Sequence, residues 1–287
     1  MKLRRSFLYP LLASAGMVAV AVPAVAAPVS EIVMDAQSGT TLFSSAAKRV
    51  RPPASLTKMM TLLLTFEAIS SGKLRPGDRL VMTRRGARQP PSKLGLAAGR
   101  SMSVGAAMRS VAVVSANDVA VALAEKVGGG EKAFVRAMNR RAAQLGMTNT
   151  RFGNVTGLAP AGGTTTARDM AVLARYIIRR YPERYRLFSA RSIRWNGYVR
   201  PNHNRLLGRV RGVDGVKTGY TVPAGYNLAA SSLRGGKRVI VVVLGARTAA
   251  ARDLLVSNLL ESGFSSPVVT KGRRVPPLNR PARKKKR

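Results

Sequence analysis

Residues 213–246 read VDGVKTGYTVPAGYNLAASSLRGGKRVIVVVLGA. Apolar and small residues alternate through most of this stretch, which is typical of β-strands. The alternation predicts three strands, at residues 213–222, 225–233 and 238–246, and the Gly-Gly pair at residues 235–236 predicts a tight turn between the last two. Strands joined by tight turns are antiparallel neighbours, so we expect this stretch to build part of an antiparallel sheet.

The rest of the chain adds two strands and several helices. A hairpin is expected near the N-terminus, with strands at residues 31–35 and 40–44. Helical periodicity begins at Ser55 and returns at residues 103–127, 131–145, 166–181 and 248–262, with a break at the polar residues 115–117. The order predicts an α/β (α+β) fold, in which both chain ends build one five-stranded antiparallel sheet around a helical insert at about residues 70–200.

Three short polar motifs follow one another along this predicted framework. Ser55 and Lys58 form a Ser-x-x-Lys pair, Ser115 and Asn117 form the chain's only Ser-x-Asn, and Lys-Thr-Gly occupies residues 217–219. The last two motifs have ordinary alternatives: Ser115 and Asn117 could be a helix-cap pair, residues 218–219 a strand ending in a turn, and Lys217 a surface cation. Their joint order, and a topology that brings them to one cleft, instead indicate a serine acyl-transfer site that needs no histidine.

The Ser-x-x-Lys pattern occurs three times, and context separates the copies. Ser55 opens an apolar helical run, and Lys58 lies one turn further on the same face. The copy that starts at Ser45 lies in a polar segment, and the copy that starts at Ser70 is interrupted by Gly72, which predicts a helix end. We therefore expect those two copies on the surface.

Composition removes most other kinds of active site. The 287 residues include no cysteine and one histidine, so thiolate chemistry and cysteine- or histidine-rich metal sites are excluded, and no cofactor is expected. A Ser-His-Asp triad would have to use His203, but its polar surroundings at residues 201–205 are typical of a loop or strand edge. Arginines outnumber lysines 36 to 13, yet the cation of the Ser-x-x-Lys motif and that of the Lys-Thr-Gly motif are both lysine. Only lysine can lose its proton when buried beside another cation.

Ser-x-x-Lys, Ser-x-Asn and Lys-Thr-Gly are together the signature of penicillin-binding proteins and class A β-lactamases. Within that superfamily the chain resembles the low-molecular-mass D-alanyl-D-alanine carboxypeptidases of peptidase family S11. The resemblance covers about residues 29–264 and implies a β-lactamase/transpeptidase-like fold. Its most specific stretches are ASLTKMMT at 54–61, VSAND at 114–118, LGMTNT at 145–150 and GVDGVKTG at 212–219.

The resemblance also implies an activity and a role for each motif residue. A serine D-Ala-D-Ala carboxypeptidase removes the terminal D-alanine of peptidoglycan stem peptides through an acyl-enzyme, and β-lactams inhibit it covalently. Ser55 would be the nucleophile, Lys58 the general base and Ser115 a proton relay. The backbone N–H groups of Ser55 and Tyr220 would form the oxyanion hole. The substrate-binding residues would be Asn117, which holds an amide, and Lys217, Thr218, Gly219 and Tyr220, whose strand binds the substrate carboxylate.

The chain departs from the family pattern in three places. Tyr220 stands where many members have histidine, which puts side-chain contacts to substrate in doubt. Only a short segment follows Phe264, too short for the second β-rich domain and anchoring helix that many members carry. The arginine-rich segment at residues 84–88 has no assigned role.

The two ends of the chain are expected to lie outside the peptidase domain, residues 27–264. Basic residues, an apolar run at 7–22 and Ala-Val-Ala at 24–26 predict a signal peptide over residues 1–26, and hence export to the periplasm or cell envelope. An uncleaved membrane anchor is the alternative. Residues 265–287 predict a basic, disordered tail, which either contacts an anionic membrane or is inert.

The net charge of +37 indicates attraction to anionic polymers. Nucleic acid is not the expected partner, because aromatic residues make up only 5% of the chain and are scattered.

Three other functions compete with the carboxypeptidase. A D,D-endopeptidase that cleaves peptidoglycan cross-links would use the same residues. A class A β-lactamase needs a deacylating glutamate, and residues 133–216 offer only Asp169, Glu183 and Asp214, none in a recognisable motif. A basic envelope-binding protein with a degenerate site would be expected to lack Ser55, Lys58 or Lys217, and all three are present.

Overall fold

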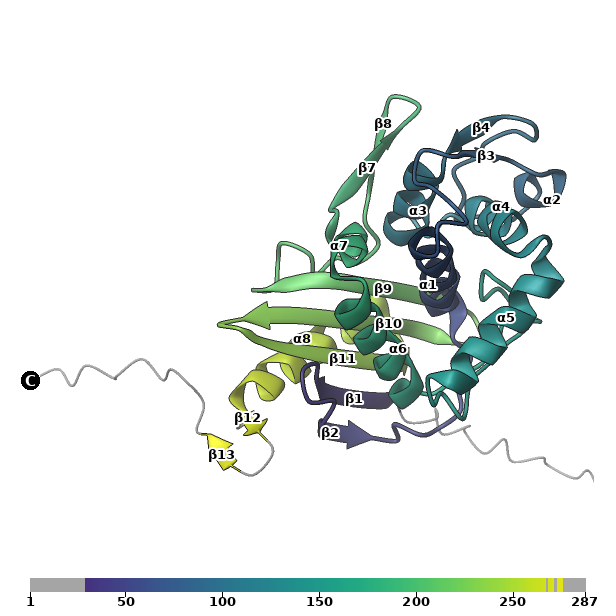
Figure 1. Cartoon of the computed structure of the whole chain (residues 1–287). Helices are drawn as coiled ribbons and strands as arrows, with labels where there is room; N and C mark the ends of the chain where they lie inside the picture. Colours follow the sequence, from purple (N-terminus) through teal and green to yellow (C-terminus); the bar gives the residue numbers. More distant parts are fainter. Residues whose placement is uncertain (1–28, 267, 271–272, 276–287) are drawn as a thin grey trace, which may run out of the picture.

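The computed structural model describes residues 29–266, 268–270 and 273–275, and an antiparallel sheet lies at its centre (Figure 1). The sheet has five strands in the order β2-β1-β11-β10-β9, so two strands come from the start of the chain and three from its end. Their bounds are Ser30–Asp35 (β1), Thr41–Ser45 (β2), Val213–Thr221 (β9), Gly225–Arg234 (β10) and Lys237–Ala246 (β11). The predicted fold class and the assembly of the sheet from both ends are confirmed.

Alternation along the central strand β11 gives the sheet two apolar faces. The odd-numbered valines 239–243 join a core cluster with Val256 and Leu260 of α8 (Ala249–Ser265). The even-numbered residues 240–244 join the larger cluster that contains α1 (Thr57–Ser70) and α6 (Ala167–Arg180). Burial of each such side chain is worth about 1.5–3 kcal/mol, so helices on both faces hold the sheet rigid.

The helical subdomain lies between β2 and β9 in the sequence. The predicted break in the 103–127 helix is confirmed: α3 ends at Val113 and α4 begins at Asn117. Two helices begin with side-chain caps, since Ser103 and Thr166 accept hydrogen bonds from the N–H groups of Ala106 (3.2 Å) and Asp169 (3.1 Å). The remaining bounds are Arg79–Val81 (β3), Arg84–Ala87 (α2), Ser101–Ser103 (β4), Val104–Val113 (α3), Asn117–Gly128 (α4), Glu131–Gln144 (α5), Arg151–Phe152 (β5) and Gly163–Thr164 (β6).

A segment that the sequence analysis left unassigned connects α6 to β9. It contains α7 (Pro182–Tyr185), a 3-10 turn η2 (Arg186–Ser189), and the hairpin of β7 (Ser192–Trp195) and β8 (Tyr198–Pro201). Figure 1 shows this hairpin projecting from the sheet beside α3. Its turn residues Asn196 and Gly197 both have positive φ, at 48° and 79°, which is the backbone that an Asn-Gly hairpin turn adopts.

The structure describes only some of the residues at the two ends of the chain. The signal peptide at 1–26 and the basic end at 276–287 lie outside the described residues. Within the segment expected to be disordered, β12 (Val268–Thr270) and β13 (Arg273–Val275) pair as two antiparallel strands. Over the described part of the chain, no helix combines the length and the apolar character needed to cross a membrane.

Candidate active site

Ser55 and Lys58 meet at the start of α1. Ser55 lies in a 3-10 turn, η1 (Ala54–Leu56), directly before the α-helix rather than within it as the sequence predicts. The Lys58 Nζ donates a hydrogen bond to the Ser55 Oγ at 3.0 Å. Ala54 has a φ of 47°, a strained value for a residue with a side chain, and such strain is common at functional sites. The other two Ser-x-x-Lys pairs are exposed, as predicted.

Strand β10 fixes the position of this turn through Asn227. Its side-chain amide donates to the carbonyl oxygens of Pro52 (3.1 Å) and Pro53 (3.2 Å), and its Oδ1 accepts from the Gly245 N–H at 2.8 Å. Asn227 is fully buried, so the sheet holds the chain just before Ser55 by hydrogen bonds from an interior side chain. The sequence analysis missed this residue, although a lone amide inside an apolar strand is a detectable signal.

Lys58 is fully buried and has few partners for its charge. Besides Ser55, its Nζ donates to the Thr156 carbonyl oxygen at 2.8 Å. Burial first, and then the nearby Lys217 ammonium, hold the Lys58 pKa well below its usual value. A lysine in this state readily gives up its proton and can then accept one from the adjacent serine hydroxyl.

Ser115 and Asn117 occupy the break between α3 and α4. Ser115 has a φ of 60°, which turns the chain sharply between the two helices. Asn117 donates from its side-chain amide to the Pro90 carbonyl oxygen at 2.9 Å. The Ser115 Oγ and the Asn117 Oδ1 are buried and have no hydrogen-bond partner among the described residues. Buried polar atoms are nearly always paired, so two orphans that face one cleft indicate a place for a ligand.

Lys217, Thr218 and Gly219 lie on β9, the edge strand next to Ser55. Lys217 is 1% exposed, and its Nζ donates to the Thr218 carbonyl oxygen at 3.1 Å. Burial, and then the Arg252 guanidinium, lower the Lys217 pKa to about 7. A Cβ added to Gly219 would lie 3.0 Å from the Ser55 nitrogen, so glycine allows the strand to approach η1. This close approach explains the third position of the Lys-Thr-Gly motif.

Tyr220, the residue after the motif, forms part of the cleft wall. Its ring is half exposed and stacks on the Tyr226 ring of β10, with a centroid separation of 4.3 Å. The position is therefore occupied by a fixed aromatic pair.

The structure gathers the predicted residues around one cleft of about 430 Å³. Ser55, Ser115, Asn117 and residues 218–220 line it, while Lys58 and Lys217 lie buried behind its wall. The sequence analysis missed most of the remaining lining, because these residues stand in no motif: Pro91, Ser92, Leu158, Pro201, Asn202, His203, Arg205, Tyr226, Ala249 and Arg252.

His203 lines the cleft but has the wrong neighbours for a catalytic triad. Burial, and then the cations Lys217, Lys58 and Arg252, lower the His203 pKa to about 4. A triad histidine instead needs a carboxylate that stabilises its charged form. The described residues also contain no cluster of three or more His, Cys, Asp or Glu side chains that could hold a metal ion.

A cleft serine bonded to a buried lysine, with Ser-x-Asn and Lys-Thr-Gly on the same cleft, is the arrangement of the penicillin-recognising serine proteins. The comparisons with known proteins narrow this class to one family. The profile of peptidase family S11, described as D-alanyl-D-alanine carboxypeptidase, matches residues 17–248, and the chain belongs to this family.

Individual relatives agree with this assignment. The chain is 36% identical over 245 residues to the D-alanyl-D-alanine carboxypeptidase DacF of Bacillus subtilis and 39% identical over 241 residues to DacD of Escherichia coli. Each match covers 82% of this chain and 62% of the relative, so the chain spans about three fifths of the length of these proteins.

Solved structures show the same similarity in three dimensions. Penicillin-binding protein 6B from Escherichia coli matches with a TM-score of 0.79 and 38% identity, over 85% of this chain and 80% of that one. Penicillin-binding protein D2 from Listeria monocytogenes, in its cefotaxime-bound form, matches with a TM-score of 0.75 and 33% identity, over 82% and 96% of the two chains.

Proposed function

We propose that this protein is an exported serine D-Ala-D-Ala carboxypeptidase that trims the terminal D-alanine from peptidoglycan stem peptides. The observation that carries the proposal is the hydrogen bond of 3.0 Å between Ser55 and the buried Lys58, whose pKa is strongly lowered. Family membership and the names of the relatives supply the substrate class.

The acylation step follows from the positions of the two side chains. Neutral Lys58 accepts the Ser55 proton as the Oγ attacks the carbonyl carbon of the penultimate D-alanine. The C–N bond to the terminal D-alanine breaks, and the leaving amine receives a proton by way of Ser115, whose hydroxyl has no other partner among the described residues. Water then cleaves the ester and regenerates Ser55.

The substrate carboxylate is recognised by buried positive charge. Lys217 is almost fully buried, and the neighbouring Arg252, itself 4% exposed, disfavours its charged form. A carboxylate beside Lys217 and the Thr218 hydroxyl would offset this repulsion, so the site favours a peptide with a free C-terminus.

The remaining roles belong to the two walls of the cleft. Asn117 would accept a hydrogen bond from the substrate amide through its unpartnered Oδ1. The N–H groups of Ser55 and Tyr220 would bind the oxyanion, with Gly219 keeping strand β9 close to η1. β-Lactams place a strained acyl group before the same nucleophile and would inhibit the protein covalently, and one relative has been solved with cefotaxime and with ampicillin bound.

The two ends of the chain would determine where the protein acts. Residues 1–26 would direct export to the periplasm or cell envelope, where the substrate lies, and residues 27–264 would form the peptidase domain. Residues 265–287 would contact anionic membrane or envelope polymers through their basic side chains.

Mass analysis of reaction products tests the proposal. A pentapeptide ending in D-Ala-D-Ala should release free D-alanine, whereas a cross-linked peptide dimer should stay intact. Separation of the dimer without D-alanine release would identify a D,D-endopeptidase instead. Absence of both products, together with no covalent penicillin adduct, would rule out an enzymatic role.

A further inference from the structure

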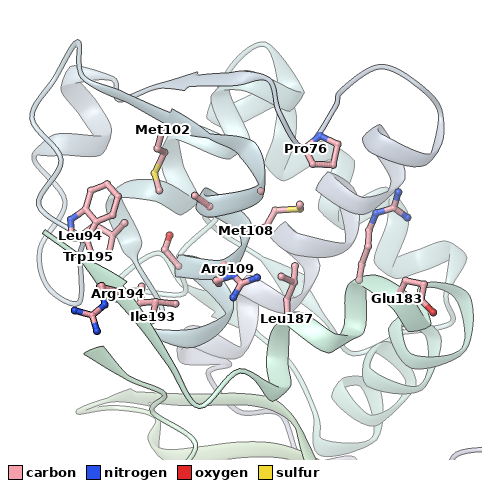
Figure 2. A pocket seen from close by; sticks show the side chains of 14 residues that line it. Pro76, Leu94, Met102, Met108, Arg109, Glu183, Leu187, Ile193, Arg194 and Trp195 are labelled. Atoms are coloured by element: carbon pink, nitrogen blue, oxygen red, sulfur yellow. The ribbon is translucent and has the colours of Figure 1, made fainter. Parts of the chain in front are cut away.

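A second depression lies on the molecule, outside the cleft that holds Ser55. It is a groove of about 460 Å³ between α3 and the segment of α7, η2 and β7, and this volume lies within the range of about 300–1,000 Å³ typical of ligand sites. Figure 2 shows it running from Leu94 and Trp195 at one end to Pro76 and Glu183 at the other, with Met108 and Arg109 between them. Most of its surface is apolar, and its apolar side chains are Leu94, Met102, Met108, Leu187, Ile193 and Trp195.

Positive charge surrounds this apolar floor. Arg109 of α3 and Arg194 of β7 are exposed, and Arg184 of α7 is half buried. Glu183 is the only acidic residue among the described residues that line the groove, and it pairs with Arg186 at 3.3 Å. The groove therefore combines apolar surface with an excess of arginine, which suits a ligand with an uncharged body and carboxylate groups.

The groove and the cleft share the same walls. The loop between α2 and β4 gives Leu94 to the groove and Pro91 and Ser92 to the cleft. The hairpin likewise gives β7 to the groove, while β8 ends at Pro201, which lines the cleft. The Arg200 Nη1 donates to the Lys93 carbonyl oxygen at 2.9 Å and so joins the hairpin to that loop. The groove and the cleft therefore border the same loop and the same hairpin.

Trp195 gives the groove an aromatic surface with an unused donor. Its indole Nε1 is buried and has no acceptor among the described residues. A buried donor without an acceptor is unfavourable, and tryptophan N–H groups are normally paired when buried. A small shift of the hairpin that brings this N–H to a ligand oxygen would remove that penalty.

We propose that the groove binds the sugar backbone of a peptidoglycan strand while one of its stem peptides occupies the cleft. Sugar rings would lie on the apolar floor and against the Trp195 ring. Carboxylates of neighbouring stem peptides would pair with Arg109, Arg184 and Arg194. The choice of ligand rests on the proposed function, because that function makes the substrate a polymer with acidic side branches.

Binding of defined polymers to the full chain tests the proposal. The groove variant is Arg109→Glu with Arg194→Glu, and its matched control is Arg136→Glu with Arg140→Glu, two exposed arginines of α5 that do not line the groove. The probe is a soluble glycan strand whose tripeptide stems lack D-Ala-D-Ala and so do not occupy the cleft as substrate. Poly-L-glutamate and anionic lipid vesicles serve as comparison ligands.

The groove variant should bind the glycan strand at least about tenfold more weakly than the control variant, because two arginine–carboxylate contacts are lost and the new glutamates repel the carboxylates. Trp195→Leu should weaken it further, with little change in salt dependence. Both double variants should bind poly-L-glutamate and vesicles equally weakly, since these ligands respond to net charge. The ratio of D-alanine release from the polymer to release from the free pentapeptide should also fall in the groove variant.

Equal losses of glycan binding in the two double variants would overturn the proposal and leave only the general positive field. Selective loss of poly-L-glutamate binding would show an acidic peptide as the occupant, and selective loss of vesicle binding a membrane surface. A wild-type protein that binds the strand through the groove but releases no D-alanine from the pentapeptide would contradict the proposed function alone. Circular dichroism of each variant shows that the fold is intact.

Discussion

The cleft and the groove are both positive, but they use different residues in different surroundings. The cleft relies on Lys58 and Lys217, which are buried and whose pKa values are lowered. The groove relies on exposed or half-exposed arginines, 109, 184 and 194. Arginine keeps its proton in nearly all proteins, whereas a buried lysine changes its charge readily.

Burial decides whether a positive side chain takes part in proton transfer or in ligand contact. A proton acceptor must be able to become neutral, which burial beside another cation achieves for Lys58. A docking surface must stay charged at every physiological pH, which exposed arginine achieves. The chain has 36 arginines and 13 lysines, so most of its positive side chains cannot become neutral, in contrast to Lys58 and Lys217.

The largest expected effect comes from removing the nucleophile. Ser55→Ala should abolish covalent labelling by penicillin and lower kcat by up to about 10⁶-fold, as for the nucleophile of other serine hydrolases. Ser45→Ala, in an exposed Ser-x-x-Lys copy, is the matched control and should label normally. Labelling that persists in Ser55→Ala would place the nucleophile elsewhere.

Lys58→Arg tests whether the cleft needs a base or only a charge. The guanidinium cannot lose its proton, so acylation should slow by about 10²–10⁴-fold, the usual contribution of a general base. Rates of penicillin acylation give the measurement. Lys48→Arg, at an exposed lysine, should have no effect. Normal acylation by Lys58→Arg would show that the cleft needs only a positive charge at this position, not a base.

The pH dependence of kcat/KM reports the state of Lys217. Its pKa in the free protein is about 7, so the charge that captures the substrate carboxylate is lost as the pH rises through 7. We expect kcat/KM to fall by up to about tenfold per pH unit above this value. A bound carboxylate raises the pKa, so the decline in kcat should begin at higher pH. In Lys217→Arg the alkaline decline should disappear, and its persistence would assign that decline to another group.

The smallest effect concerns the contact between β9 and η1. Gly219→Ala places a Cβ 3.0 Å from the Ser55 nitrogen and 3.1 Å from the Pro53 carbonyl oxygen. This overpacking should reduce the free energy of unfolding by about 1–3 kcal/mol and slow acylation. Gly77 faces open space, so Gly77→Ala should change stability by less than about 0.5 kcal/mol. Denaturant titration of both variants measures the difference, and equal stabilities would show that the strand has room to move.

The sheet and the motifs could be predicted because their signals are local. Apolar alternation over residues 213–246 specifies three strands, and the break at residues 115–117 follows from side chains that compete for backbone hydrogen bonds. The partners that activate the site could not be predicted in the same way. Thr156 contributes only a backbone carbonyl to Lys58, and every residue type has one.

The hairpin at residues 192–201 shows a different limit. Its strands are only four residues each, too short for a clear alternation, although the Asn-Gly turn at 196–197 was a usable sign. His203 and Arg252 reach the cleft from loops and helices far apart in the sequence, so their proximity to Lys217 depends on the tertiary fold.

The pairing of β1 with β11 has a consequence for how the protein acquires reactivity. Ser30 lies opposite Leu244, so the sheet closes only after nearly all of the peptidase domain is present. Long-range strand pairing of this kind is slow to form. In the unfolded chain Lys58 is hydrated and has no fixed cation beside it, so it has the ordinary lysine pKa of about 10.4. In the unfolded chain Ser55 is therefore an unactivated serine. Folding itself makes it a nucleophile, because the native topology places a neutral Lys58 beside it.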